Sequence, residues 1–137
     1  MTIANALPSG VSISLPSQAN EGATVAASIG SASDLGSDSL TYTVNWGDGS
    51  EDTSSSSDGF THVYADNGNY TATLRVTDSD NASVEATASV SVVNVAPSGA
   101  TLDSSTGSEG SVMNISVGAA SDVAADTLTY TVAWGDG

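Results

Sequence analysis

One segment of the chain occurs twice, and this internal repeat constrains the architecture more than any other feature. Leu40–Gly49 reads LTYTVNWGDG, and Leu128–Gly137 reads LTYTVAWGDG. An earlier segment also returns, EGATVAASIGSASD from Glu21 as EGSVMNISVGAASD from Glu109, an offset of 109 − 21 = 88 residues. Self-similarity at a fixed period of this size indicates tandem copies of one structural unit.

The period sets the expected domain organisation. One complete module is predicted at residues 1–94, and residues 95–137 are predicted to be the N-terminal half of a second module. Within a copy, apolar residues alternate with polar ones, as in strands that bury one face. Gly- and Asp-rich turns separate the alternating segments, which predicts an all-β sandwich. The strands of the first copy are expected at 11–15, 24–29, 40–46, 70–77 and 84–93.

The segment Asp66–Tyr70, DNGNY, sharpens this prediction. It matches the D-x-G-x-Y pattern of a tyrosine corner, in which the tyrosine hydroxyl bonds back to the backbone at a Greek-key crossover. We therefore expect the sandwich to have Greek-key connections, with ragged strands between Glu51 and Tyr64.

Three motifs of the first copy together resemble the polycystic kidney disease (PKD) domain. They are WGDGS at Trp46–Ser50, HVY at His62–Tyr64 and GNYTATLRVTD at Gly68–Asp78. The family pattern usually places two residues between the Trp and the Gly-Asp-Gly, and this chain has none. The shorter form resembles domains in tandem arrays of large microbial surface proteins. The resemblance implies an immunoglobulin-like sandwich, PKD-like, which acts outside the cell as a spacer or interaction module, binds calcium in some members and is not catalytic.

The charge balance excludes two classes of partner. Sixteen acidic side chains stand against one base, Arg75, and the formal net charge is −15. Phosphate backbones and anionic membranes repel such a chain, because it lacks the cations that would displace counterions. We therefore expect no nucleic acid and no membrane insertion. Cysteine is absent, which leaves a bound metal as the alternative to disulfides for stapling the fold.

Few residues are available for catalysis. General acid–base chemistry needs a histidine, a lysine or a carboxylate pair, and the chain has one histidine, His62. We interpret His62 as structural, donating to a loop carbonyl, and Asp48 as the capping residue of a tight Gly-Asp-Gly turn. Hydrolase, metalloprotease and phosphate-loop motifs are absent. The sequence therefore predicts that the module is not an enzyme.

Acidic residues gather in loops that a Greek-key sandwich brings to one end. The start of the first strand and two loops share this end, and they carry Asn5, Asp34, Asp38, Asp78 and Asp80. Carboxylates that converge without a base repel one another unless a cation lies among them. An all-oxygen ligand set suits Ca²⁺, so we predict a calcium site at this end.

The opposite end of the first copy and the start of the second supply another set of candidate ligands. They are Glu21, Asp66, Asn94, Asp122 and Asp126. We predict that they form a second calcium site across the junction, similar to the calcium-stiffened joints of cadherins. The alternative for all of these residues is that they only form or cap turns.

The leading hypothesis is therefore a non-catalytic spacer module from a repetitive extracellular or cell-surface protein, adhesin-like or filament-forming, with calcium stiffening its ends. Its expected partners are neighbouring repeats of the same array. The alternative is a carbohydrate- or protein-binding accessory module of a secreted hydrolase. Sugar-binding faces usually expose aromatic rings, and Trp46, Tyr42 and Tyr70 are predicted to face inward, which leaves Tyr64 as the candidate.

The second copy raises a separate expectation. Half a sandwich would leave four apolar residues uncovered, namely Leu128, Tyr130, Val132 and Trp134. Such an open face is a site or a liability for association. Other copies of the chain could complete this half module, but the favoured expectation is that the sequence is cut from a longer array whose following residues supply the missing strands.

Overall fold

The computed structural model describes residues 1–36, 38–123 and 126–136. The chain divides into two compact units, Met1–Asn94 and Val95–Gly137, and each is described by itself. Strands are the regular elements of both, and the described residues contain no helix. Accordingly, no described helix could span a membrane.

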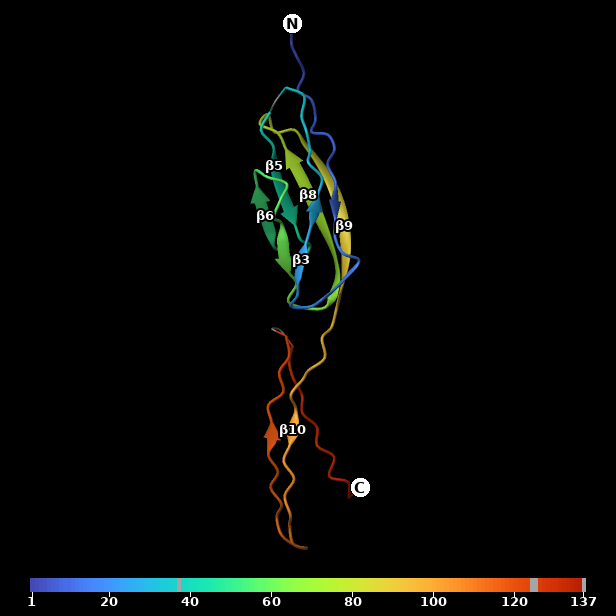
Figure 1. Ribbon diagram of the computed structural model, residues 1–137, viewed down its shortest axis with the longest axis vertical. Helices are drawn as coiled ribbons and strands as arrows, with labels where there is room; N and C mark the ends of the chain where they lie inside the picture. Colours follow the sequence, from blue (N-terminus) through green and yellow to red (C-terminus); the bar gives the residue numbers. More distant parts are fainter. Residues whose placement is uncertain (37, 124–125, 137) are drawn as a thin grey trace. The chain divides into compact units, whose positions relative to one another are not determined.

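One layer of unit 1 is a five-stranded sheet in the order β2-β9-β8-β5-β6 (Figure 1). Its strands are β2 (Gln18–Asn20), β5 (Thr41–Asn45), β6 (Glu51–Ser54), β8 (Gly68–Thr77) and β9 (Ser83–Val93). β8 and β9 form a long antiparallel hairpin, and β5 pairs antiparallel with both β8 and β6. Two neighbours in this sheet, β5 and β8, are thus far apart in sequence, as Greek-key connections require.

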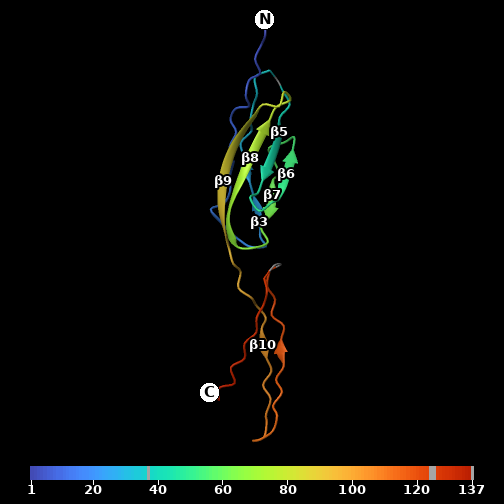
Figure 2. The same ribbon diagram turned by 180° about the vertical axis from the view of Figure 1, so that it is seen from behind.

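The second layer consists of four short strands. β1 (Ile13–Ser14) pairs antiparallel with β4 (Ser28–Ile29), and β3 (Thr24–Ala26) pairs antiparallel with β7 (Thr61–Val63). Only Ala27 separates β3 from β4, and its N–H donates to the Phe60 carbonyl at 3.0 Å. β3 lies in front of β8 in Figure 1 and behind it in the reverse view of Figure 2.

The strand expected at 11–15 is shortened to β1, and a second strand, β2, that the alternation did not predict follows it. β1 belongs to the second layer, whereas β2 crosses to the five-stranded sheet and pairs parallel with β9, Gln18 opposite Ser91 and Asn20 opposite Val93. Pro16 lies between β1 and β2. Because proline has no N–H to donate to a ladder, it interrupts pairing at this point.

The core of unit 1 lies between the two layers. Trp46, Val44 and Leu74 are completely buried at 0% exposure. The full buried set is Val25, Tyr42, Val44, Trp46, Phe60, Tyr64, Ala72, Leu74, Val76, Val90 and Val92. The alternating residues of β5 and β8 therefore face inward as predicted. The immunoglobulin-like Greek-key β-sandwich is confirmed.

Two tyrosines fix the crossover beside this core. The Tyr70 hydroxyl donates to the Asp66 carbonyl at 3.1 Å, as expected of a tyrosine corner, and the Tyr64 hydroxyl donates to the Trp46 carbonyl at 3.0 Å. The two tyrosine rings stack with centroids 4.3 Å apart. The corner and the central strand β5 are thus linked through one stacked pair.

Unit 2 repeats the pairing of the first strands of unit 1. β10 (Thr101–Leu102) pairs antiparallel with β11 (Val117–Gly118). Residues 128–134 repeat the alternation of β5 but pair with no strand in the described part of the chain. In unit 1 the ladders to β6 and β8 hold β5 extended, and the described residues of unit 2 include no counterpart of either strand.

We expect Tyr64→Phe to destabilise unit 1 more than Tyr70→Phe. Loss of the Tyr64 hydroxyl leaves a buried carbonyl without its donor, which costs about 1–3 kcal/mol. The Tyr70 bond lies at an exposed position, where water replaces the lost donor. Chemical denaturation of the two variants measures the difference, and equal losses would contradict this account of the two hydroxyls.

Candidate metal centre

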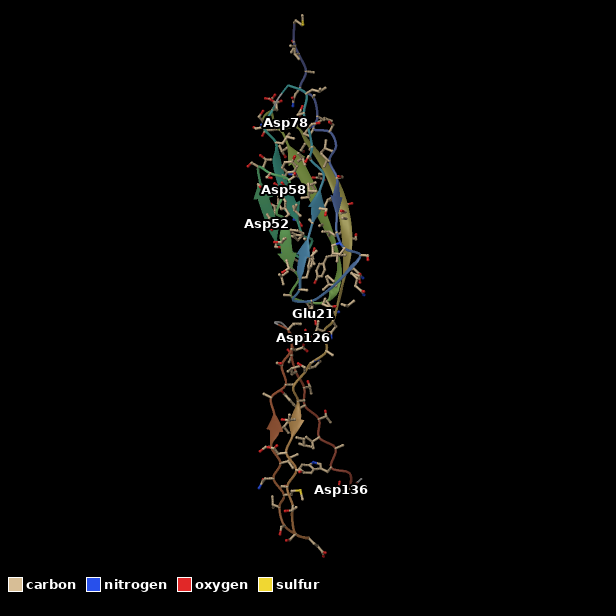
Figure 3. All side chains as sticks on the ribbon, in the orientation of Figure 1. Glu21, Asp52, Asp58, Asp78, Asp126 and Asp136 are labelled. Carbon is tan, nitrogen blue, oxygen red and sulfur yellow. The ribbon has the colours of Figure 1, made fainter. Side chains whose placement is uncertain are left out.

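Three carboxylates meet at the end of unit 1 where the chain begins. One oxygen from each of Asp34, Asp38 and Asp78 lies within 4.8 Å of the other two. Asp34 and Asp38 belong to the loop between β4 and β5, and Asp78 begins the turn between β8 and β9. Figure 3 shows Asp78 at this end. The topology thus brings the three carboxylates together, and Asn5, also expected here, adjoins them through Asp78.

The turn after β8 holds Asp78 in place. Its Oδ1 accepts hydrogen bonds from the N–H groups of Asp80 at 2.9 Å and Ala82 at 2.8 Å, and its Oδ2 accepts one from the Asn5 side-chain amide at 2.8 Å. Asn81 adopts a left-handed φ of 69°, which asparagine tolerates better than most residues. Burial raises the pKa of Asp78, but these hydrogen bonds outweigh burial and hold the pKa below its usual value.

Asp34 is the unusual member of the cluster. Both of its carboxylate oxygens are buried, and neither has a hydrogen-bond partner among the described residues. Buried polar groups are normally paired, and a buried charge without a partner is costly. In addition, two ionised carboxylates at this spacing repel by on the order of 3 kcal/mol at an effective dielectric constant of about 20. A bound cation would remove both penalties.

The other two residues predicted for this end lie beside the cluster. Asn5 and Asp80 line, together with Asp38, a hollow of about 430 Å³. The chain has a single Lys or Arg, and this residue, Arg75, pairs with Glu85 at 2.9 Å. The ligands on offer are therefore carboxylate and amide oxygens without a competing base, which fits Ca²⁺ and does not fit zinc.

Glu21 and Asp66 lie at the opposite end of unit 1. Figure 3 shows Glu21 there, far from Asp78. A carboxylate oxygen of Glu21 lies within 4.8 Å of one of Asp66, so these two predicted ligands do come together. Glu21 is buried, and its N–H donates to the Val93 carbonyl at 3.0 Å.

The remaining predicted ligands of the junction site are Asn94, Asp122 and Asp126. Asp122 accepts a hydrogen bond from the N–H of Val123 at 2.8 Å, which is a local turn interaction. Asn94 ends unit 1, whereas Asp122 and Asp126 belong to unit 2. Since each unit is described by itself, the junction site stays a prediction.

A second polar cluster surrounds His62, and sequence reasoning missed it. The His62 Nε2 atom lies 2.6 Å from the Asp48 Oδ2 atom and 3.4 Å from the Ser50 hydroxyl. The expected bond from His62 to a loop carbonyl was wrong, because the partner is this carboxylate. The imidazole also stacks on Trp46, with centroids 5.0 Å apart. The spacing in sequence gave no signal, since the pairing of β7 with β3 sets where His62 lies.

Ser50, His62 and Asp48 do not form a catalytic triad. In a triad the serine contacts one imidazole nitrogen and the carboxylate contacts the other. Here both contact the same atom, Nε2 of His62. The serine hydroxyl instead donates to Asp48 Oδ1 at 2.5 Å. The cluster thus ties β7 to the turn between β5 and β6.

Asp48 caps that turn, as predicted. The flanking residues Gly47 and Gly49 have φ values of 85° and 99°, which favour glycine. A Cβ at Gly47 would lie 2.5 Å from the Thr71 carbonyl oxygen. Asp48 Oδ1 accepts the Ser50 N–H at 3.0 Å. Burial raises the pKa of Asp48, but the bonds from Ser50 and His62 together lower the pKa below its usual value.

The lowered pKa of Asp48 predicts a pH dependence. The ionised Asp48 carboxylate stabilises the fold fully above the pKa that this carboxyl group has in the unfolded chain, about 3.9. The stabilisation is lost as the pH falls through the lower pKa of Asp48 in the folded state. We expect the Tm advantage of the wild type over Asp48→Asn to shrink between about pH 5 and about pH 2. The difference is the informative quantity, because acid also relieves the repulsion of the net charge of −15. Asp58→Asn, in an exposed loop, controls for one lost charge, and a constant gap would contradict the role of Asp48.

Comparisons with known proteins agree with the fold. The sequence profile of the PKD domain matches residues 5–93. Among solved structures, the chain resembles one from a study of carbohydrate-binding modules of the β-sandwich superfamily and their promiscuous specificity. The two share 27% sequence identity with a TM-score of 0.58, and the match covers 66% of this chain and 36% of that chain. The similarity therefore extends over only about a third of that structure's length.

No curated protein sequence matches the chain. PKD domains and the carbohydrate-binding modules are non-catalytic modules. The profile match at residues 5–93 spans more than half of the 137 residues and includes Trp46 and Tyr64 of the core and Tyr70 of the corner. The chain belongs to the PKD domain family.

Proposed function

We propose that this chain is a non-catalytic spacer from a repetitive extracellular surface protein, adhesin-like or filament-forming, and that calcium stiffens its module ends and its junction. Family membership supports a β-sandwich accessory or structural module. The repeat supports a spacer in a repetitive protein, because both units begin with the same strand pairing. Neighbouring repeats of the array are then the natural partners of each module.

The observation that carries the calcium proposal is the buried carboxylate of Asp34 beside Asp38 and Asp78. Ca²⁺ accepts six to eight oxygen ligands in flexible geometry, and three carboxylates would supply much of that set. Asn5, which already contacts Asp78, would offer its amide oxygen. Extracellular modules bind calcium at about 10⁻⁴–10⁻³ M, and we expect an affinity in this range.

Stiffening follows from where these ligands lie in the chain. Asn5 belongs to the N-terminal segment, Asp34 and Asp38 to the loop before β5, and Asp78 to the turn after β8. An ion held by all three would link these segments in addition to the bridge of Ser9 with Ser33 and the pairing of Thr41 with Thr77. The path of the chain into the module would then be fixed. A spacer needs this if its modules are to keep a defined orientation along an array.

We expect CaCl₂ to raise the Tm of the chain by several degrees and a chelator to reverse the change. A ligand at 100 times its Kd stabilises the folded state by about 2.7 kcal/mol. Asp34→Asn should abolish most of the effect while leaving a folded protein, because it removes one charge with little change of volume. Calorimetry measures Tm, and titration calorimetry measures binding.

Two controls make this test specific. Asp58→Asn removes an exposed charge outside the cluster and should keep the full calcium effect. MgCl₂ at equal concentration separates coordination from screening, since any divalent ion screens a net charge of −15. If calcium and magnesium act alike, or if Asp34→Asn responds like the wild type, the metal site does not exist.

A second candidate function is glycan binding, favoured by the match to carbohydrate-binding modules. Tyr64, the aromatic candidate, is only 1% exposed, so it has no face to stack on a sugar ring. The outer face of the five-stranded sheet offers a different surface. A polar groove of about 530 Å³ crosses it, lined by Thr43, Asn45, Glu51, Thr73, Arg75, Thr77 and Glu85. These side chains could hydrogen-bond sugar hydroxyls without stacking.

Affinity electrophoresis in gels that contain soluble polysaccharides tests this second function. If the groove binds glycan, Arg75→Ala should lose roughly tenfold in affinity, the equivalent of about 1.4 kcal/mol, because the guanidinium is its one cationic donor. Asp58→Asn lies off the groove and should bind like the wild type. Unretarded migration in every gel would reject glycan binding and leave the spacer function unaffected.

A further inference from the structure

Four aromatic rings of unit 1 form a continuous series that leads from the centre of the core towards the surface. The Trp46 indole stacks on the His62 imidazole, with centroids 5.0 Å apart. The imidazole lies edge-to-face with the Tyr64 ring at 4.7 Å, and the Tyr64 ring stacks on that of Tyr70 at 4.3 Å. We propose that this series carries oxidation out of the core, so that an electron lost from Trp46 is replaced by one from Tyr70.

The series begins at a side chain that soluble reductants do not reach. Trp46 is 0% exposed, and the chain contains no cysteine that could reduce it from within. Absorbed light ionises an indole even inside a core, because the ejected electron leaves for water. An oxidised indole that persists reacts further and opens its ring. That reaction would destroy the side chain around which the two layers pack.

Asp52 is placed to hold the indole proton while Trp46 is oxidised. The indole N–H donates to Asp52 Oδ2 at 2.8 Å, and loss of an electron makes this N–H strongly acidic. The proton therefore moves to the carboxylate and returns when the indole regains an electron. In this exchange no proton has to enter the core from solvent.

Tyr64 connects Trp46 to the surface but cannot keep the oxidation. Its hydroxyl donates to the Trp46 carbonyl at 3.0 Å, and the residue is 1% exposed. A phenol gives up its proton when it loses an electron, and an amide carbonyl is too weak a base to accept that proton. The oxidation therefore passes through Tyr64 to the ring that stacks on it.

Tyr70 is the member of the series at which the oxidation can end. It is only partly buried against the core, and its hydroxyl makes its hydrogen bond at an exposed position. Burial and the negative charge of nearby carboxylates, above all that of Asp66, raise the pKa of Tyr70. The hydroxyl is therefore protonated at neutral pH and releases its proton only on oxidation, when water can take it up.

Electrons and protons balance over the whole sequence of steps. Light removes one electron from Trp46, and dissolved oxygen takes up this electron as superoxide. The O–H bond of Tyr70 then breaks, with its electron passing to the indole and its proton to water. Trp46 is restored and Tyr70 becomes a neutral phenoxyl radical, which a water-soluble thiol reduces by donating a hydrogen atom. This protective role adds to the proposed spacer function and requires neither calcium nor unit 2.

Laser flash photolysis of a Trp134→Phe chain tests the transfer. The chain has two tryptophans, so Trp46 is the only indole of this variant, and excitation at the red edge of its absorption ionises indole in preference to phenol. We expect the absorbance of the indole radical to decay while that of a tyrosine radical rises at the same rate, whatever the protein concentration. Tyr70→Phe in this background should make the indole radical several-fold longer-lived and remove most of the tyrosine radical.

Tyr42→Phe is the matched control, because it removes a phenol from the same core but outside the series. It should behave like the Trp134→Phe parent. Equal lifetimes of the indole radical in the parent and in Tyr70→Phe would overturn the proposal, and so would a rate that rises with protein concentration. Asp52→Asn keeps an acceptor for the indole N–H but cannot hold the proton, so the spectrum of the protonated indole radical should persist longer. An unchanged spectrum would overturn the role of Asp52.

A measurement on the parent with all its tyrosines covers the case in which Tyr70→Phe does not fold. Irradiation in the presence of a nitroso spin trap, followed by digestion and mass spectrometry, should place most of the tyrosine adduct on Tyr70. An adduct mainly on another tyrosine would overturn the proposed end of the series. Because a chelator can be present throughout, failure of this test leaves the calcium proposal to its own experiment, and the reverse also holds.

Discussion

The fold of unit 1 depends on the surroundings of one side chain, Trp46. The indole is fully buried; its N–H donates to Asp52 on β6, and its ring stacks on His62 of β7. Its carbonyl receives the Tyr64 hydroxyl. A single residue directly after β5 therefore connects both layers of the sandwich with the corner that precedes β8. A large apolar ring supplies the burial, and its polar edge supplies bonds that only this arrangement of strands can satisfy.

The sequence predicted the parts of this fold that depend on local pattern. Alternation over 40–46 predicted an inward-facing Trp46, and the spacing of Asp66 and Tyr70 predicted the tyrosine corner. Residue pattern could not predict what long-range register decides. Gln18 pairs with Ser91 because the chain crosses between layers after Pro16, and His62 meets Asp48 because β7 pairs with β3. Neither outcome is encoded in the spacing of nearby residues.

The candidate metal centre likewise combines features that the sequence predicted with features that only the three-dimensional structure reveals. Greek-key topology was enough to predict that Asp34, Asp38 and Asp78 share one end, since loops and turns at one end of a sandwich are neighbours whatever their sequence separation. The difference between them appears only in three dimensions. Asp78 is satisfied by its own turn and by Asn5, whereas the oxygens of Asp34 are buried without a partner among the described residues. Composition cannot distinguish one aspartate from another, whereas burial in the structure does.

The parallel pairing of β2 with β9 has a mechanical consequence. In unit 1 the chain enters at one end and leaves at the other, where β9 leads out (Figure 1). Tension applied to the two ends pulls β2 and β9 in opposite directions along their common axis. The bonds that join Gln18–Asn20 to Ser91–Val93 are then loaded together in shear, whereas an antiparallel terminal pair would unzip one bond at a time. A module built in this way resists stretching as a unit.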